Sequence, residues 1–304
     1  MRKTVMNATT AWPAIVEYVR QDPEARFPRL LALDMDGTLL DGAKRIPDSF
    51  WSLAQDLHRA GCQVVPSSGR QLATLSEMFA SDETISDFVA ENGAVVASQG
   101  QVIATQSWNK PTVMATLGAI TAATTGLDRV GVVVCSAAEA LIRQVDPSLF
   151  EAIQAYYRSL RYDDELVSAV GRAEFDVVKM AVYIPDADQY QRFLRSLEEH
   201  AANTEQLATV DIVRSGRQWV DIMDSRVSKA TGLSALGKHH EVSLQDCMAV
   251  GDYLNDLQML KGVGTSVVVA NAHPEVFEVA DFAIGANTDH GVIALMEALV
   301  EYAP

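Results

Sequence analysis

Short apolar runs that end at turn residues recur near both ends of this 304-residue chain, with helical patterns between them. Each run has the length and composition of a buried strand, and the runs lie at 30–33, 63–66, 87–90, 247–250, 265–269 and 281–284. Strands that alternate with helices form parallel sheets whose faces the helices cover. We therefore predict an α/β fold with a Rossmann-like, doubly wound parallel sheet, which both ends of the chain complete together.

The helical patterns between the runs support this prediction. Residues 50–57 place their apolar side chains on one helical face, with Asp48 as the expected N-cap and Gly61 as the expected stop. Two more helices are expected at 274–280 and 290–302.

The middle of the chain lacks this alternation. Helices are expected there at 111–123, 147–158 and 187–201, and strands at 130–134, 177–184 and 209–213. We interpret residues 108–221 as an inserted α+β domain, with the core formed by residues 29–107 and 222–304. Residues 1–28 are an N-terminal extension that holds one amphipathic helix of unassigned role.

The charge of the chain limits its partners. It carries 24 basic and 40 acidic residues, a net charge of −16. A protein this acidic repels nucleic-acid phosphates and anionic membranes over most of its surface, so we expect neither as a partner. If it binds a phosphate, a local cation must offset that field.

Cysteine usage and hydropathy point to a cytoplasmic protein. Cys62, Cys135 and Cys247 are far apart and form no CxxC pair, which argues against a disulfide framework or a zinc site. Apolar runs stay well below the roughly 18 residues of a membrane helix. The first residues of the chain lack the apolar stretch of a signal peptide.

The strongest chemical signal is Asp34-Met35-Asp36-Gly37-Thr38, directly after a predicted buried strand. Open α/β sheets place ligands at this end of their strands. One carboxylate of such a pair can attack phosphorus, while the other gives a proton to the leaving group and later takes one from water. Two carboxylates beside a phosphate require a cation, and oxygen ligands favour Mg²⁺. The alternative is a plain turn; an EF-hand is excluded, because the glycine stands fourth instead of sixth.

Three further clusters lie at strand or helix ends, and each is ambiguous by itself. Ser68-Gly69 follows the second strand and could hold phosphate oxygens or cap a helix. Lys229 lies at an expected helix start and is either a phosphate-binding cation or a solvated charge. Residues 251–256, Gly-Asp-Tyr-Leu-Asn-Asp, could complete a metal site or form an N-cap.

In this order the four clusters resemble the haloacid dehalogenase (HAD) superfamily, whose pattern is DxDGT, a Ser or Thr after the second strand, a Lys, and GDxxND. Residues 91–94, Glu-Asn-Gly-Ala, together with Asn271-Ala272 and the position of the insert, resemble its Cof-type subfamily with a C2 cap, HAD-IIB. Residues 65–95 are similar to bacterial sugar phosphatases of that group, and the whole resemblance covers roughly residues 29–300.

The resemblance implies a Mg²⁺-dependent phosphatase that forms an aspartyl phosphate. Asp34 would be the nucleophile and Asp36 the general acid and base. The metal would be held by Asp34, the backbone carbonyl of Asp36, and Asp252.

The resemblance also implies a phosphate site. Ser68 and Lys229 would bind the transferring phosphoryl group, Asn255 would reach it, and Asp256 would support the metal shell or Lys229. Tyr253 departs from the usual pattern, and we expect it to narrow the pocket mouth. Further phosphate contacts are expected from Thr38 and Gly69.

The expected substrate is a small phosphorylated metabolite, a sugar phosphate by the resemblance. The insert would act as a lid that selects it, with Asn92, Lys179, Ser215 and Arg217 as candidate contacts; each has a surface or structural role as its alternative.

Two other functions stay open at this point. A phosphosugar mutase would have to keep water from the phosphoenzyme, while a phospho-receiver or binding protein is disfavoured by the insert and by Asp36. Nothing in the sequence indicates an oligomeric state.

Overall fold

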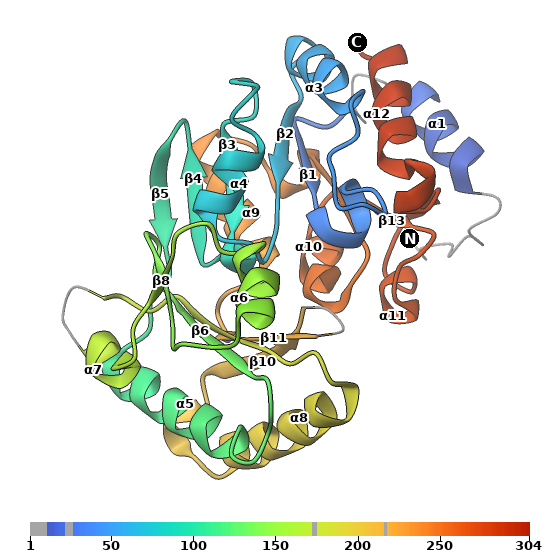
Figure 1. Cartoon of the computed structure of the whole chain (residues 1–304). Coiled ribbons are helices and arrows are strands. Elements are labelled where there is room, and N and C mark those ends of the chain that lie inside the picture. The colour runs from blue at the N-terminus through green and yellow to red at the C-terminus, as the bar shows by residue number, and fades with distance from the viewer. Residues whose placement is uncertain (1–10, 22–26, 172–174, 216–217) are drawn as a thin grey trace. The chain divides into compact units, whose positions relative to one another are not determined.

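A computed structural model describes residues 11–21, 27–171, 175–215 and 218–304, which divide into two compact units (Figure 1). The core unit comprises residues 1–68, 75–104 and 228–304, and the insert unit comprises residues 69–74 and 105–227, within those described ranges. The predicted domain boundary at 221 and 222 falls inside strand β11 (Trp219–Asp224) of the insert unit.

A five-stranded parallel sheet forms the centre of the core unit, in the order β14-β13-β12-β1-β2. Its strands are β1 (Leu30–Leu33), β2 (Gln63–Pro66), β12 (Cys247–Gly251), β13 (Thr265–Val269) and β14 (Phe282–Ile284). Leu33 lies level with Val250 on one side and with Pro66 on the other, so the carboxyl ends of three neighbouring strands meet at one edge. The loops that carry the predicted chemistry begin at this edge.

Both faces of the sheet are buried. Leu30 and Ala32 join a buried cluster with Leu233 of helix α9 (Lys229–His239). Because side chains alternate along a strand, Leu31 and Leu33 face the opposite side, where they are also fully buried. The other core helices are α1 (Ala11–Gln21), α3 (Phe50–Arg59), α10 (Leu257–Gly262), α11 (Pro274–Phe277) and α12 (Gly291–Glu301). The predicted doubly wound α/β fold is confirmed.

In the core unit, the start of α3 and the end of α11 differ from the predictions. The N-cap of α3 is Ser49 instead of Asp48, and it makes no side-chain capping bond, so the first turn begins without the predicted cap. Helix α11 ends at Phe277, three residues before the predicted 280, because only one turn forms before the chain enters β14. Helix α3 ends at Arg59, just before Gly61, as predicted.

The strand at 87–90 does not extend the parallel sheet as predicted. It forms β3 (Asp87–Ala90), which pairs in antiparallel fashion with β4 (Val95–Ser98) in a separate three-stranded sheet that β5 (Gln101–Thr105) completes. A single parallel bridge joins Ser67 to Val89. The reason is local, since the turn η2 (Glu91–Gly93) reverses the chain at once and gives β3 a nearer partner.

The insert unit is a six-stranded sheet with helices, in the order β10-β11-β9-β6-β7-β8. Besides β11, its strands are β6 (Gly131–Cys135), β7 (Ala140–Ile142), β8 (Leu160–Tyr162), β9 (Lys179–Tyr183) and β10 (Val210–Arg214). Neighbouring strands of this sheet pair in antiparallel fashion, except that β7 and β8 are parallel. The sequence did not predict β7, β8 or β11, but the predicted α+β character of the insert is confirmed.

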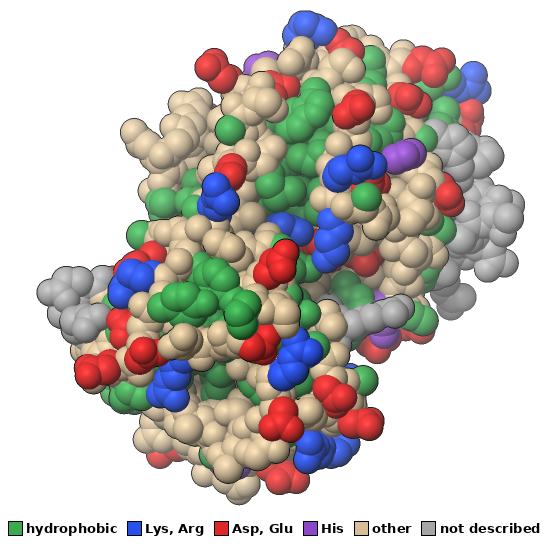
Figure 2. All heavy atoms as spheres, viewed as in Figure 1, with side chains coloured by type: hydrophobic (Ala, Val, Ile, Leu, Met, Phe, Trp, Pro, Cys, Tyr) green, Lys and Arg blue, Asp and Glu red, His purple; other side chains and the backbone are tan. Residues whose placement is uncertain are grey.

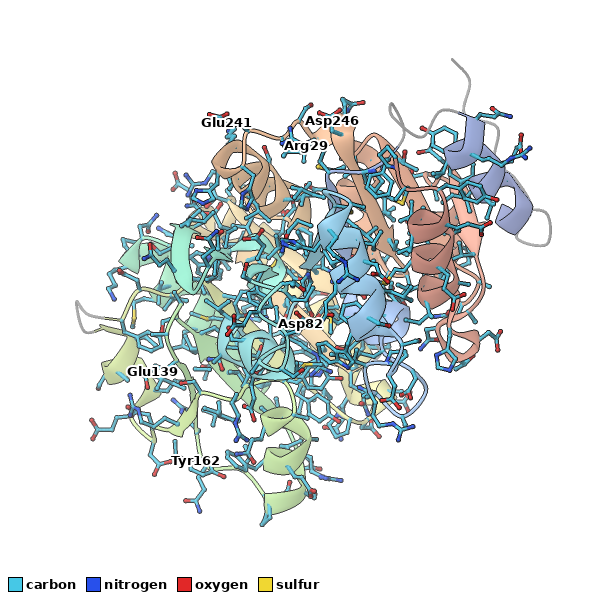
Figure 3. The ribbon with its side chains drawn as sticks, turned by 90° about the horizontal axis from the view of Figure 1, so that it is seen from above. Arg29, Asp82, Glu139, Tyr162, Glu241 and Asp246 are labelled. Atoms are coloured by element: carbon cyan, nitrogen blue, oxygen red, sulfur yellow. The ribbon has the colours of Figure 1, made fainter. Side chains whose placement is uncertain are left out.

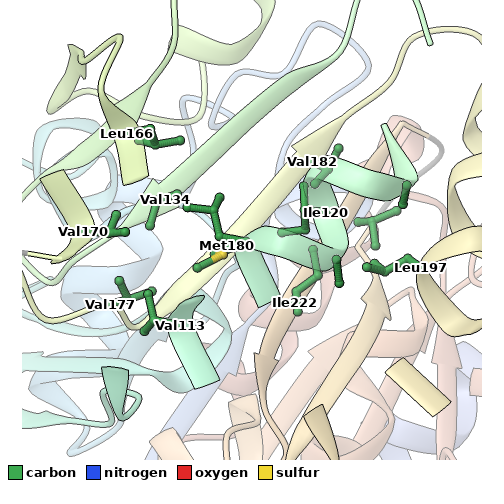
Figure 4. Packing of buried hydrophobic residues seen from close by; sticks show 14 of the residues in the cluster. Val113, Ile120, Val134, Leu166, Val170, Val177, Met180, Val182, Leu197 and Ile222 are labelled. Atoms are coloured by element: carbon green, nitrogen blue, oxygen red, sulfur yellow. The ribbon is translucent and has the colours of Figure 1, made fainter. Parts of the chain in front are cut away.

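Helices pack on the sheet of the insert unit through one buried apolar cluster. They are α5 (Lys110–Ala123), α7 (Leu166–Gly171) and α8 (Ala187–Ala202). Helix α6 (Pro147–Gln154), which ends before the predicted 158, buries Leu149 and Ile153 outside this cluster. Figure 4 shows Val113 and Ile120 of α5 against Val134, Met180 and Ile222 of the sheet. Helix α4 (Leu72–Met78) starts within the short segment that the insert unit takes from the first half of the chain.

The predicted N-terminal helix forms α1 and packs on the core. Ile15 and Val19 are buried, and the ring of Tyr18 lies 5.0 Å from that of Phe282 in β14. The Tyr18 hydroxyl also lies 3.3 Å from Thr265 Oγ1. The extension therefore covers the β14 edge of the core sheet.

At the amino end of β1, Arg29 makes one backbone bond and one side-chain bond to the segment that precedes β12. Arg29 donates its backbone N–H to Asp246 O at 2.8 Å and its Nη1 to Glu241 O at 3.3 Å, and Figure 3 shows the three residues together. On the face seen in Figure 2, acidic and basic side chains are interspersed. Within the described ranges, helices of membrane-spanning length and hydropathy are absent.

Candidate active site

The DxD motif turns away from the sheet directly after β1. The Asp34 N–H donates to Val250 O at 3.0 Å, which fixes this carboxylate at the strand end. The next residues form the tight turn η1 (Met35–Leu39), in which Gly37 has φ of 91°. A Cβ atom at Gly37 would lie 2.4 Å from Asp252 Oδ2, so only glycine permits both this conformation and this approach. The turn thereby brings the motif against Asp252.

Lys229 is fully buried between two carboxylates. Its Nζ donates to Asp34 Oδ1 and, at 2.6 Å, to Asp256 Oδ1. The residue is the first of α9, and Ser228 caps that helix by accepting the Thr231 N–H with its side chain. The cap fixes the helix start and thus the point from which Lys229 extends.

Glycine at position 93 lets the η2 turn approach this helix start. Gly93 has φ of 101°, and a Cβ atom there would lie 2.1 Å from Ser228 O. Any side chain at this position would push the turn away from the backbone that precedes Lys229. The Glu-Asn-Gly run is therefore part of the same local structure as the lysine.

Asp256 orients its neighbours with both carboxylate oxygens. Oδ1 accepts from Lys229, while Oδ2 accepts the backbone N–H groups of Asp252 at 3.0 Å and Tyr253 at 3.1 Å. Asp256 itself is fully buried. It thus links the GDxxND loop to the lysine, which is one of the two roles that the sequence predicted for it.

The charges of this cluster do not balance. Burial raises the pKa of Asp34 and of Asp252 above the usual carboxyl range, and the negative charge of Asp256 adds to both shifts. Burial opposes the charge on Lys229, but Asp256 and Asp34 outweigh that effect and raise its pKa, so the ammonium stays protonated. One cation facing three buried carboxylates leaves a deficit of positive charge.

The donor set fits a divalent cation. Asp34, Asp252 and Asp256 each offer an oxygen atom, and these atoms lie within 4.8 Å of one another. Since Asp256 is engaged with Lys229 and two backbone N–H groups, Asp34 and Asp252 are the carboxylates best placed to bind an ion. The Thr38 hydroxyl donates to Asp252 Oδ1 at 3.1 Å and so orients Asp252, a contact that the sequence did not predict.

Asp36 occupies a different environment from Asp34. Its side chain is 31% exposed, and Oδ1 lies 3.4 Å from Nζ of Lys44, which is itself largely exposed. A carboxyl group that reaches solvent can exchange its proton with water, whereas the buried Asp34 is held by Lys229. The two aspartates of the motif therefore lie in different environments. Such a difference suits two separate tasks, proton transfer by the exposed carboxyl group and nucleophilic attack by the buried one.

Ser68 is buried and held by its backbone beside the η2 turn. Its N–H donates to Val89 O at 2.8 Å, and its carbonyl accepts the Asn92 N–H at 2.9 Å. Asn92 is also buried, and its Oδ1 accepts from Asn255 Nδ2 at 3.1 Å. The structure thus connects the loops after β2, β3 and β12 through Ser68 and Asn255, which were predicted at the phosphate site, and Asn92, which was predicted as a substrate contact.

Three predicted substrate contacts belong to the insert unit. Gly69 and Lys179 bond to each other, with Lys179 Nζ 2.6 Å from Gly69 O. Lys179 is buried, and Nζ also lies 3.5 Å from Asp221 Oδ1. The backbone N–H of Ser215 donates to Trp219 O at 3.3 Å. Arg217 lies outside the described residues, so its role stays a prediction.

Asn271 and Asn287 support the motif turn, and sequence analysis assigned no role to either. Asn271 Nδ2 donates to Gly37 O at 2.8 Å, and its Oδ1 accepts the Asn287 N–H at 3.0 Å. Asn287 Nδ2 then reaches Leu40 O at 2.8 Å. The Asn271-Ala272 pair gave a signal for the first of these residues, whereas Asn287 stands in a loop without any recognisable pattern.

Comparison of the sequence with known proteins finds a hydrolase family and phosphatases among its relatives. A family model described as haloacid dehalogenase-like hydrolase matches residues 31–296. The putative phosphatase YkrA of Bacillus subtilis is 26% identical over 276 residues, which is 89% of this chain and 97% of that protein. The 5-amino-6-(5-phospho-D-ribitylamino)uracil phosphatase YbjI of Escherichia coli is also 26% identical, over 90% of this chain and 97% of its own length.

Solved structures share the fold. The HAD subclass IIB sugar phosphatase BT4131 superposes with a TM-score of 0.71 at 20% sequence identity, over 88% of this chain and 97% of that one. At this level of identity the likeness concerns the architecture, which includes both the parallel core and the insert.

Proposed function

Because this chain belongs to the haloacid dehalogenase-like hydrolases and is a phosphatase of that family, we propose that it hydrolyses small phosphate monoesters with Asp34 as nucleophile and Mg²⁺ as cofactor. The observation that carries the proposal is the buried cluster in which Lys229 bridges Asp34 and Asp256 while Asp252 lies beside them. Phosphoryl transfer depends mainly on positioning and on charge stabilisation, and this cluster provides both.

Asp34 is the group that forms the covalent bond. One carboxylate oxygen attacks phosphorus, the bond from phosphorus to the ester oxygen breaks, and an aspartyl phosphate results. Lys229 fixes the orientation of this carboxylate through its bond to Oδ1 and offsets the repulsion between the carboxylate and the phosphate. Ser68 and Asn255, which lie in the neighbouring loops, bind phosphoryl oxygens in this proposal.

Asp36 moves the protons. As an acid it protonates the leaving ester oxygen, and as a base it then takes a proton from the water that attacks the aspartyl phosphate. Its partial exposure supports this role, because solvent can restore its protonation state between turnovers.

Asp34, Asp252 and the backbone carbonyl of Asp36 would hold the Mg²⁺ ion. When bound, the ion supplies positive charge beside the phosphate, which the cluster lacks by itself. Thr38 and Asp256 keep Asp252 oriented for this purpose through its side chain and its backbone N–H.

We further propose that the insert, residues 108–221, is a cap that selects the substrate, and that this substrate is a phosphorylated sugar or polyol. The compound after which the YbjI phosphatase is named carries a phosphorylated ribityl chain, which supports the choice. A cytoplasmic location is proposed as well, because all three cysteines are free and buried and phosphorylated metabolites arise in that compartment.

Incubation of the protein with Mg²⁺ and p-nitrophenyl phosphate tests the reaction. Nitrophenol and inorganic phosphate should accumulate in equal amounts over many turnovers. A single turnover that stops at a stable phosphoenzyme, or transfer of the phosphoryl group to an added sugar phosphate without release of phosphate, would favour the mutase instead. A panel of phosphorylated metabolites ranked by kcat/KM then identifies the substrate class.

A further inference from the structure

A cavity of about 400 Å³ lies within the insert unit, and all the residues that line it belong to that unit. Its walls come from α5, from the segment that leads into β6, from the loop between β7 and α6, and from the first residue of α7. The lining residues include none of the predicted catalytic, metal-binding or substrate-binding residues. Small-molecule sites are commonly cavities of this size with apolar walls and a few polar groups.

Most of the wall is apolar. Leu117, Ile120 and Leu166 line the cavity and belong to the buried apolar cluster of the insert; the last two are labelled in Figure 4. Val130 and Val132 pack against the same cluster but keep part of their surface exposed. Covering such surface with an apolar group is favourable, because it removes apolar area from water. The wall therefore suits the apolar part of a ligand.

The charged side chains that line the cavity leave an excess of positive charge. They are Arg129, Arg143 and Asp146, two cations and one anion, in a chain whose net charge is −16. A local positive charge in so acidic a protein attracts an anion to this place.

Arg129 is already engaged within the protein. Its Nη2 donates to Ser148 Oγ at 2.7 Å, and its Nε lies 3.5 Å from Asp146 Oδ2. Asp146 also accepts from the Ser148 hydroxyl and from the Leu149 N–H, and these bonds lower the pKa of its carboxyl group. Asp146 is therefore ionised and balances the charge of Arg129. This pair joins the segment before β6 to the start of α6.

Arg143 carries the charge that remains. Its side chain is exposed, and it makes no hydrogen bond or ion pair with any other residue of the described ranges. A guanidinium presents its N–H donors as a planar fork that matches the two oxygens of a carboxylate. One uncompensated positive charge also suits a monoanion better than a phosphate dianion. Arg143 can therefore bind a carboxylate at the edge of an apolar cavity.

We propose that this cavity binds a small organic anion, with its carboxylate on Arg143 and its apolar body between α5 and the loop that joins β7 to α6. The proposal does not depend on the proposed phosphatase mechanism, because every group that it uses lies in the insert unit.

Isothermal titration calorimetry of the full chain with three probes tests the chemistry of the site. Octanoate has both a carboxylate and an apolar chain, and it should bind at one site per molecule. Octanol lacks the charge and acetate lacks the chain, so each should bind at least about tenfold more weakly. Asp34→Asn should bind octanoate as tightly as the wild type, because Asp34 does not line the cavity.

A pair of arginine variants tests the role of the charge. Arg143→Gln should weaken octanoate binding about tenfold, since a charge-assisted bond is lost. Arg192→Gln removes an exposed arginine of α8 that does not line the cavity, and it should leave the affinity unchanged.

A pair of threonine variants tests the location. Thr121 of α5 lines the cavity and is exposed, so Thr121→Trp places a ring at the wall and should weaken octanoate binding at least about tenfold. Thr125→Trp is the matched control, because Thr125 is exposed as well but does not line the cavity. Both hydroxyls donate to backbone carbonyls, at 2.7 Å to Leu117 O and at 3.0 Å to Thr121 O.

Several results would overturn the proposal. Octanoate that does not bind, or binds no better than octanol, would exclude an anion site. Equal losses in Arg143→Gln and Arg192→Gln would show attraction by overall charge instead of by one residue. Unchanged affinity in Thr121→Trp would place the ligand elsewhere. If Thr121→Trp does not fold, the arginine pair still decides, because it changes only exposed side chains.

Discussion

The ammonium of Lys229 lies 2.6 Å from Oδ1 of Asp256, and both side chains are fully buried. A buried ion pair depends on both of its members, because removal of one leaves an uncompensated charge in a medium that cannot solvate it. This pair also fixes Asp34 and the backbone of Asp252, so the stability of the core and the geometry of the site share the same contacts.

Lys229→Met should therefore destabilise the protein as well as inactivate it. We expect a loss of about 3 kcal/mol in the free energy of unfolding, since two buried carboxylates lose their cation. Urea unfolding in metal-free buffer measures it. Lys238→Met, an exposed position on the same helix, should change the same quantity by less than about 0.5 kcal/mol. Equal effects of the two variants would contradict the buried bridge.

Asp34→Asn should abolish turnover while the fold stays intact. An amide is nearly isosteric with the carboxylate but cannot form the aspartyl phosphate, so we expect a loss of at least about 1000-fold in kcat. Phosphate release from p-nitrophenyl phosphate measures activity, and circular dichroism checks the fold. Asp246→Asn, on the surface, is the control. Turnover within a few fold of wild type would show that another group is the nucleophile.

Asp36→Asn should affect substrates unequally. Without the proton donor, an alkoxide leaving group such as a sugar should suffer about 100-fold more than p-nitrophenolate, which leaves without protonation. The ratio of kcat/KM values for a sugar phosphate and p-nitrophenyl phosphate, in wild type and variant, measures this difference. An equal loss for both substrates would exclude Asp36 as the acid.

Removal of metal should stop the enzyme reversibly. EDTA should abolish activity, Mg²⁺ should restore it, and Ca²⁺ should restore it poorly, because Ca²⁺ takes more ligands at longer distances. Mg²⁺ should also raise the melting temperature of the wild type by mass action, and Asp252→Asn should remove that increase. Asp289→Asn, an exposed acid of the core unit, should keep it. Full activity in metal-free buffer would contradict the assigned cofactor.

Much of the core could be predicted from sequence because its signals are local. Buried strands such as β1 and β12 are continuous apolar runs, and the DxD and GDxxND motifs follow them directly. Strands β7 and β8 have three residues each, too few to show a periodic pattern. The pairing of β3 depends on which strand the chain reaches first after η2. The sequence of β3 alone does not encode this partner.

The candidate active site likewise contains residues that could be predicted from the sequence and residues that could not. Asp34 and Asp36 were predicted from residue type and position, whereas the roles of Lys229 and Asp252 were expected from the resemblance that the four clusters form together. The supporting contact of Asn287 with Leu40 O was not predicted, because it joins segments far apart in sequence through a backbone group, which any residue carries. Lys179 shows the converse, since a cation in an acidic chain suggested ligand binding, yet its ammonium is buried against Gly69 O and near Asp221.

The pairing of β1 with β12 also determines when the enzyme can first work during synthesis. Leu30 lies beside Cys247, so β1 waits for one of its two partner strands, which the ribosome delivers after the whole insert has emerged. The insert is continuous apart from residues 69–74 and can complete its own sheet earlier. Until β12 arrives, Asp34 has neither Val250 behind it nor Asp252 beside it, and a nascent chain therefore carries the proposed nucleophile in an inactive form.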